Sequence, residues 1–219
     1  MSSRPDLDLS VYLVTDTAMC GGPDGVVATV RAAVAHGATV VQLRDHDLGD
    51  DDFVTLGRRL VEAVAPHGVP LLVDDRVDLV SAIGAAGAHV GQSDMPVRRA
   101  REILGPDALL GLSLQDPSGV EAVRRLGPGV VDYLGVGALR STGTKPGAAA
   151  LGPVGIREVV VASPWPVCAI GGVVADDAED LARLGCQGMA VVSAICAADD
   201  PASATATLAE AWRRARGRA

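Results

Sequence analysis

Aromatic side chains are scarce in this 219-residue sequence: they make up 2% of it, whereas apolar residues as a whole make up 48%. The core must therefore be built mainly from valine, leucine and alanine. Aliphatic residues of this kind suit strands that are covered by helices on both faces. The length allows one domain with a sizeable core or two small domains.

Cysteine pairs and an excess of positive charge are also missing. The four cysteines (Cys20, Cys168, Cys186 and Cys196) form no CxxC pair, so the sequence predicts buried free thiols rather than a zinc site or a disulfide framework. The formal net charge is -8, whereas a nucleic-acid-binding surface is basic, so we expect no nucleic-acid partner. Anionic substrates stay possible, because a local cationic pocket or a metal ion can outweigh the global field.

Long hydrophobic runs are absent as well. No apolar segment is long enough to span a bilayer, and the first ten residues, MSSRPDLDLS, lack the apolar stretch of a signal peptide. The sequence therefore predicts a soluble cytoplasmic protein without a membrane partner.

Strand-like and helix-like patterns alternate along the chain. Short apolar runs typical of buried strands cover residues 11–14, 39–43, 70–73, 88–90, 109–112, 130–134, 167–170 and 188–192. Helical patterns follow them at 24–36, at 50–65, from the end of the third strand to about 86, and at 96–104, 117–126, 154–162, 176–184 and 201–216.

Eight strand–helix units predict an α/β protein, a (β/α)8 TIM barrel with a parallel eight-stranded core. We expect one domain over residues 1–219, with a flexible N-terminus at 1–9. An open doubly wound sheet is the alternative, but its first turn should carry GxGxxG, which is missing there.

Polar residues follow the predicted strands at the ends where TIM barrels bind their ligands. Asp75 and Asp94 follow two successive strands, and carboxylates placed in this way suit Mg²⁺, although each could instead cap a helix. The last two strands end in Gly171-Gly172 and Val192-Ser193, where barrels often bind a monophosphate through backbone N–H groups. The competing interpretation of Gly171-Gly172 is an ordinary strand-to-helix turn.

Cationic residues occur near the same ends. Gln42 and Arg44 are two apart on a strand, so their side chains point the same way. The guanidinium can hold a phosphate and the amide can read the edge of a heterocycle, whereas a structural Arg–Asp pair is the alternative. His36, His67 and His89 show no metal or triad spacing and are interpreted as structural, while His46 is ambiguous.

A loop rich in small residues covers 135–152 and reads GVGALRSTGTKPGAAALG. Thr142, Thr144 and Lys145 place two hydroxyls and one ammonium group among its glycines. This composition is typical of a mobile active-site flap that closes over a polyanion, and equally of a solvated surface loop.

The chain resembles the thiamine phosphate synthase family nearly from end to end. The matching segments are VQLR at 41–44, DDRVD at 74–78, HVGQSD at 89–94, DYLGVG at 132–137, TGTK at 142–145, AIGG at 169–172 and VVSAI at 191–195. Each segment alone is weak evidence. Their order, and their position at successive strand ends, make the set specific.

The resemblance implies a transferase of thiamine biosynthesis. It would join the pyrimidine of hydroxymethylpyrimidine diphosphate to thiazole phosphate and release pyrophosphate by a dissociative substitution. Asp75 and Asp94 would hold Mg²⁺. The small-molecule substrates would be bound by Gln42, Arg44, Asp74, Ser113, Thr142, Thr144, Lys145, Gly172, Val192 and Ser193. Of these, Arg44, Lys145 and Ser113 would act on the diphosphate, and we expect a homo-oligomer.

The sequence departs from the family pattern at three places. The family usually has lysine where His46 stands and asparagine where Asp74 stands, and a Pro-x-Phe-Pro-Thr type pattern is common where this chain has ALRST at 138–142. Arg140 is a candidate to replace the charge missing at position 46. Two other functions stay open: a thiazole tautomerase, which Gln115 disfavours because that pattern has histidine there, and a non-catalytic barrel that binds a phosphate ligand.

Overall fold

The computed structural model describes residues 4–140 and 150–218. Its strands are all parallel and pair in chain order, and the last pairs with the first to close a barrel. They are β1 (Val11–Val14), β2 (Val40–Leu43), β3 (Leu71–Asp74), β4 (Gly87–Val90), β5 (Leu109–Leu114), β6 (Tyr133–Val136), β7 (Val167–Ala169) and β8 (Gly188–Val191). The predicted TIM barrel is confirmed.

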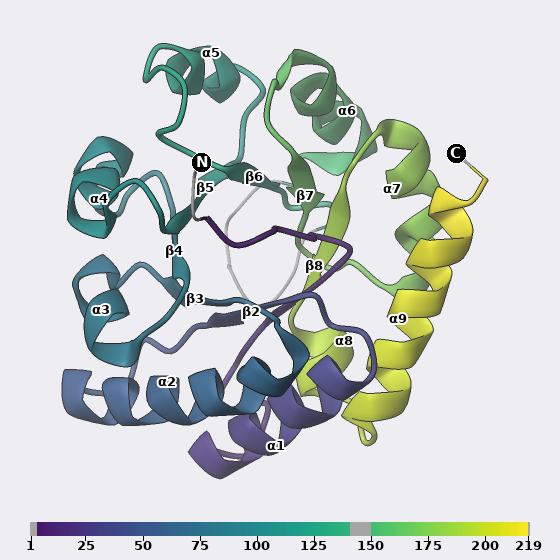
Figure 1. Cartoon of the computed structure of the whole chain (residues 1–219). Coiled ribbons are helices and arrows are strands. Elements are labelled where there is room, and N and C mark those ends of the chain that lie inside the picture. Colours follow the sequence, from purple (N-terminus) through teal and green to yellow (C-terminus); the bar gives the residue numbers. More distant parts are fainter. Residues whose placement is uncertain (1–3, 141–149, 219) are drawn as a thin grey trace.

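Helices surround the barrel (Figure 1). They are α1 (Pro23–Ala35), α2 (Asp50–Val64), α3 (Val80–Ile83), α4 (Val97–Leu104), α5 (Gly119–Arg124), α6 (Gly152–Ala162), α7 (Ala178–Leu184), α8 (Ser193–Cys196) and α9 (Pro201–Arg216), with 3-10 turns η1 (Ala65–His67), η2 (Val77–Leu79) and η3 (Ala175–Asp177).

The strands carry apolar residues on both faces because one face packs against the helices and the other packs inside the barrel. In β1, Val11 and Leu13 belong to the large core between strands and helices, whereas Tyr12 and Val14 belong to a smaller core inside the barrel. This alternation is the period-two pattern of a strand. It explains why the strands read as continuous apolar runs in the sequence.

Some element boundaries differ from those predicted. The sixth strand was expected at 130–134, but β6 is Tyr133–Val136, because Gly127 and Gly129 adopt positive φ angles (89° and 79°) and delay the extended backbone. The helix after β3 was expected to reach about residue 86. It ends at Ile83, since Gly84 adopts the left-handed conformation that stops a helix. The short helix α8 after β8 was not expected.

Residues 4–9 cross one end of the barrel, where the purple segment runs in Figure 1. The described residues of this segment make several contacts with the barrel. Leu9 is buried in the inner core, and Arg4 pairs with Asp132 and donates a hydrogen bond to the carbonyl of Gly129 at 3.1 Å. This part of the N-terminal segment therefore closes the end of the barrel opposite the strand C-termini.

The cysteines behave as the sequence predicts: all are free, three are buried and Cys20 is half-buried.

Among the described residues, no helix combines the length and the apolar character needed to cross a membrane.

Candidate active site

A cavity of about 540 Å³ opens at the C-terminal ends of the strands. Residues from every strand or the loop after it line this cavity. Seven of the substrate contacts implied by the family resemblance are among them: Gln42, Arg44, Asp74, Ser113, Gly172, Val192 and Ser193. Asp75 and Asp94 are not among its lining residues, and Thr142, Thr144 and Lys145 lie outside the described part of the chain.

A chain of hydrogen bonds crosses the inside of the barrel along the wall of this cavity. Gln42 Nε2 donates to the Tyr12 hydroxyl at 2.8 Å, and the hydroxyls of Tyr12 and Tyr133 are 2.7 Å apart. The Tyr133 hydroxyl is 2.8 Å from His89 Nδ1, and His89 Nε2 is 2.8 Å from Ser113 Oγ. We call these five residues the polar chain. Its two ends, Gln42 and Ser113, are both predicted substrate contacts.

Burial keeps both phenols of the polar chain neutral. It raises the pKa of Tyr12 and of Tyr133 far above the ordinary value for tyrosine. Each phenol therefore has one hydrogen to donate and can accept from a neighbour. The polar chain orients the amide of Gln42 and the hydroxyl of Ser113 relative to each other.

Three members of the polar chain were not predicted from the sequence. Tyr12 and Tyr133 were not named as candidates, and His89 was interpreted as structural. The glycine at position 111 is the feature of the sequence that could have indicated them. It stands in register with His89 on one side and Tyr133 on the other. A Cβ at Gly111 would lie 2.4 Å from His89 Nδ1 and 2.2 Å from Tyr133 Cζ. Glycine is required there because two large side chains share its space.

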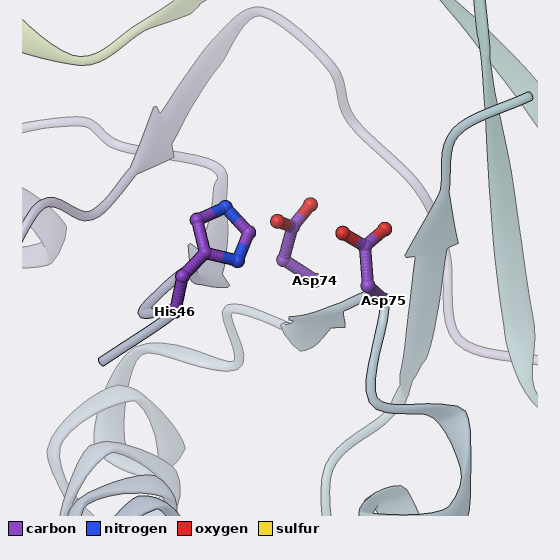
Figure 2. A group of neighbouring side chains, drawn as sticks. All are labelled: His46, Asp74 and Asp75. Atoms are coloured by element: carbon purple, nitrogen blue, oxygen red, sulfur yellow. The ribbon is translucent and has the colours of Figure 1, made fainter. Parts of the chain in front are cut away.

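A second group of polar residues lies at the ends of β2 and β3. His46, Asp74 and Asp75 each offer a ligand atom, and these atoms all lie within 4.8 Å of one another. Figure 2 shows the imidazole beside the two carboxylates. The imidazole is exposed, whereas Asp74 and Asp75 are half-buried. We call these three residues the His46–Asp74–Asp75 group, and their donor set suits a divalent cation.

Arg44 lies beside this group, with its Nε 3.5 Å from Asp74 Oδ2. The Arg–Asp pair that the sequence offered as an alternative is thus formed, with Asp74 as the partner of Arg44. Both partners also line the cavity. The guanidinium therefore balances one carboxylate and still faces the space where an anionic ligand would bind.

Asp94 lies apart from this group in the described structure. Its carboxylate is exposed, and Oδ2 accepts a hydrogen bond from the N–H of Gly91 at 2.8 Å. This bond closes the turn after β4, so Asp94 caps that turn and not helix α4, whose N-cap is Pro96. The role of Asp94 in metal binding stays a prediction.

The loops after β7 and β8 form the opposite side of the cavity. Gly171 and Gly172 have φ angles of 94° and 71°, which favour glycine, and Ser193 begins helix α8. Gly171, Gly172, Val192 and Ser193 all line the cavity. Their backbone and hydroxyl groups are the donors that a monophosphate needs.

Arg140 supports the first of these loops. It donates to the carbonyl of Gly172 at 2.6 Å and to Asp177 Oδ2 at 2.7 Å, and Asp177 accepts from the N–H of Val174 at 2.9 Å. Burial works to raise the pKa of Asp177, but the hydrogen bonds from Arg140 and from the N–H of Val174, together with the charge of Arg140, outweigh it and lower that pKa. Arg140 is therefore engaged beside α7 and does not replace a charge at position 46.

Fold and site together define a class: a TIM barrel with a polar cavity at its strand C-termini, glycine-containing loops after β7 and β8, and carboxylates beside an arginine at the ends of β2 and β3. The model of the thiamine monophosphate synthase family matches residues 11–195. The chain belongs to this family, and the resemblance drawn from its motifs is confirmed.

Curated relatives and solved structures agree with this assignment. The chain is 45% identical to a thiamine-phosphate synthase of Xanthobacter autotrophicus, covering 95% of this chain and 98% of the relative. It is 38% identical to one of Desulfitobacterium hafniense, covering 94% and 99%. The structure of thiamine phosphate pyrophosphorylase from Pyrococcus furiosus superposes with a TM-score of 0.86 at 31% identity, covering 95% of this chain and 97% of that one.

Proposed function

We propose that this protein is a thiamine phosphate synthase. It transfers the hydroxymethylpyrimidine group from its diphosphate to thiazole phosphate and so forms thiamine phosphate and pyrophosphate. The observation that carries the proposal is the family match over residues 11–195, joined to a cavity with two separate polar sides. One side has Arg44 and Asp74, and the other has the glycine loops, as two phosphorylated substrates require.

The first substrate would lie over Gln42 and Arg44. Gln42 is held by Tyr12 at one end of the polar chain, so its amide is oriented before an aminopyrimidine binds. The Arg44 guanidinium and the Ser113 hydroxyl would contact the diphosphate, together with Asp74 through the cation. Lys145 is proposed as a further cation on the diphosphate.

The second substrate would place its phosphate at Gly172, Val192 and Ser193, and Thr142 and Thr144 are proposed as further contacts of that phosphate. The protein then needs only to orient the thiazole nitrogen toward the pyrimidine methylene. No protein nucleophile is required, because the electron-rich aminopyrimidine stabilises a carbocation when its diphosphate leaves. Arg44 and Lys145 favour that departure by balancing the developing negative charge.

A divalent cation fits the same end of the cavity. The carboxylates of Asp74 and Asp75 supply the hard oxygen ligands that Mg²⁺ prefers, and Asp94 is proposed as a further ligand through its carboxylate. When bound, Mg²⁺ would neutralise charge on the leaving pyrophosphate. The homo-oligomer and the cytoplasmic location stay predictions of the sequence.

Incubation with hydroxymethylpyrimidine diphosphate, thiazole phosphate and Mg²⁺ tests the proposal. We expect thiamine phosphate and pyrophosphate in equal amounts, and no product after addition of EDTA. Asp75→Asn should lower kcat/KM by at least about 100-fold, the usual effect of losing one charge-stabilising contact. Asp78→Asn, an exposed carboxylate three residues further on, is the matched control and should keep full activity.

Failure to form thiamine phosphate would overturn the proposal. Conversion of thiazole tautomers without the pyrimidine substrate would favour the tautomerase. Binding of thiazole phosphate without turnover would favour a barrel that only binds a phosphate ligand.

A further inference from the structure

His46 is held beside Asp74 and Asp75 by contacts that clamp two loops together. The Asp45 carboxylate accepts from the N–H groups of Asp47 at 2.8 Å and Leu48 at 2.7 Å, so the loop after β2 is a tight turn. Arg76, which directly follows Asp75, donates to the carbonyl of Leu48 at 2.7 Å. The loop that carries His46 is thereby tied to the end of β3.

The same arginine is fixed on its other side. Its guanidinium carbon lies 4.4 Å from the centre of the Phe53 ring, and Phe53 is fully buried in helix α2. A cation over an aromatic face in a partly buried position is a stabilising contact. The position of His46 relative to the two carboxylates is therefore set by packed residues, although its imidazole is exposed.

We propose that the His46–Asp74–Asp75 group binds one divalent transition-metal cation through a ring nitrogen of His46 and the carboxylates of Asp74 and Asp75. Ligand atoms about 2.0–2.2 Å from one ion can lie at most about 4.4 Å apart. The three ligand atoms here lie within 4.8 Å of one another, so only a small closure is needed. The inference rests on the proposed function, which assigns these strand ends to a substrate's cation.

The nitrogen decides which cations the group prefers. Mg²⁺ takes oxygen ligands and keeps several waters, so it gains little from an imidazole. Affinity for nitrogen and oxygen donors rises from Mn²⁺ through Fe²⁺ to Co²⁺, and imidazole is a common ligand of such ions. This chain should therefore bind transition-metal cations more tightly than a site made of carboxylates alone.

The competing arrangement has no metal–nitrogen bond: the imidazole would only donate a hydrogen bond to a carboxylate, as a cationic side chain there would. Mn²⁺ separates the two arrangements, because its electron spin senses a directly bonded ¹⁴N nucleus in pulsed electron paramagnetic resonance. The measurement needs only the full chain and MnCl₂. We expect modulation from one coordinated nitrogen.

His46→Gln should remove that nitrogen modulation and weaken Mn²⁺ binding at least about tenfold, the lower bound for losing even an outer partner of a ligand. Mg²⁺ affinity should change less. His67→Gln, an exposed histidine in η1, is the matched control and should keep both the modulation and the affinity. Because the imidazole of His46 is exposed, His46→Gln should keep the fold, and thermal unfolding of the variant checks this.

Absence of nitrogen modulation, its persistence in His46→Gln, or absence of Mn²⁺ binding would overturn the inference. Turnover of the two thiamine precursors without a nitrogen signal would leave the proposed function standing and remove this inference. A nitrogen signal without any formation of thiamine phosphate would leave this inference standing and overturn the proposed function.

Discussion

Asp75 combines an unfavourable backbone conformation with a position at the site. Among the described non-glycine residues, it alone has a positive φ angle, 58°. Its N–H donates to the carbonyl of His89 at 3.0 Å, so the turn after β3 is anchored to β4. Left-handed backbone at a residue other than glycine costs free energy and clusters at functional sites. Here it turns the carboxylate toward Asp74 and His46.

Replacing Asp75 with glycine or with alanine tests this cost. Both variants should lose activity, because both lack the carboxylate. Asp75→Gly should have a free energy of unfolding about 1 kcal/mol higher than Asp75→Ala, since glycine adopts the left-handed conformation without a Cβ clash. Urea denaturation of the two variants measures the difference.

The matched control is Asp78, which lies in the right-handed backbone of η2. There the order should reverse, with alanine more stable than glycine by roughly 0.5–1 kcal/mol. The same order at both positions would contradict the assignment of strain to Asp75.

At the scale of elements, the polar chain ties five strands together across the inside of the barrel. Tyr12 comes from β1, Gln42 from β2, His89 from β4, Ser113 from β5 and Tyr133 from β6. Buried polar groups are costly unless each has a partner, and here each neighbour supplies one. The strands therefore hold the two cavity-lining ends of the polar chain, Gln42 and Ser113, in a fixed relation.

Tyr133→Phe should break the polar chain at its centre. The buried partners, Tyr12 and His89, would each lose a hydrogen bond, so the free energy of unfolding should fall by about 1–3 kcal/mol. We also expect kcat/KM to fall, because Gln42 and Ser113 are no longer coupled. Denaturation and steady-state kinetics measure the two effects.

A double-mutant cycle with Tyr12→Phe identifies the cause. The two phenols share a 2.7 Å hydrogen bond, so their effects on stability should couple by at least about 0.5 kcal/mol. Simple additivity would mean that the phenols act separately and that no continuous chain exists.

At the scale of the whole molecule, the two ends of the barrel have different tasks. The end at the strand N-termini is closed by Asp132, which accepts from Arg101 at 2.7 Å and from the N–H of Leu110 at 2.8 Å, and which also pairs with Arg4. Arg101 donates further hydrogen bonds to the carbonyls of Gly105 and Ala108. This cluster joins the N-terminal segment, α4 and the starts of β5 and β6.

Asp132→Ala should lower stability and leave the chemistry intact. The side chains of Asp132 and Arg101 are only 11% and 12% exposed, so removal of the carboxylate leaves a largely buried guanidinium without its ion-pair partner. The expected loss is about 3 kcal/mol of unfolding free energy. Below the unfolding temperature, kcat should match that of the unaltered protein.

Glu102→Ala provides the comparison, because Glu102 pairs with Arg99 on the surface, where the side chains are 65% and 63% exposed. That change should alter stability by less than about 1 kcal/mol. A fall in kcat for Asp132→Ala without a fall in stability would contradict this division of the barrel.

The elements that could be predicted are those whose ends are fixed by residues close to them in the sequence. Val11–Val14 and Asp50–Val64 were expected within a residue at each end, because their patterns and flanking residues act over a few positions. The start of β6 was missed, since the apolar pair Val130-Val131 resembles a strand but follows two glycines in positive φ. Motif order likewise placed Gln42, Arg44, Asp74 and Ser113 at the cavity, because parallel strands end on one face.

The sequence by itself therefore determined the barrel, its family and the face that carries the cavity, because periodicity and motif order are local properties that a parallel barrel brings to one end. Tertiary structure decided the rest. Tyr12, His89 and Tyr133 lie far apart in the chain and meet only when register and closure bring their strands together. His46 joins Asp74 and Asp75 because Arg76 ties two loops, while Asp94 closes its own turn.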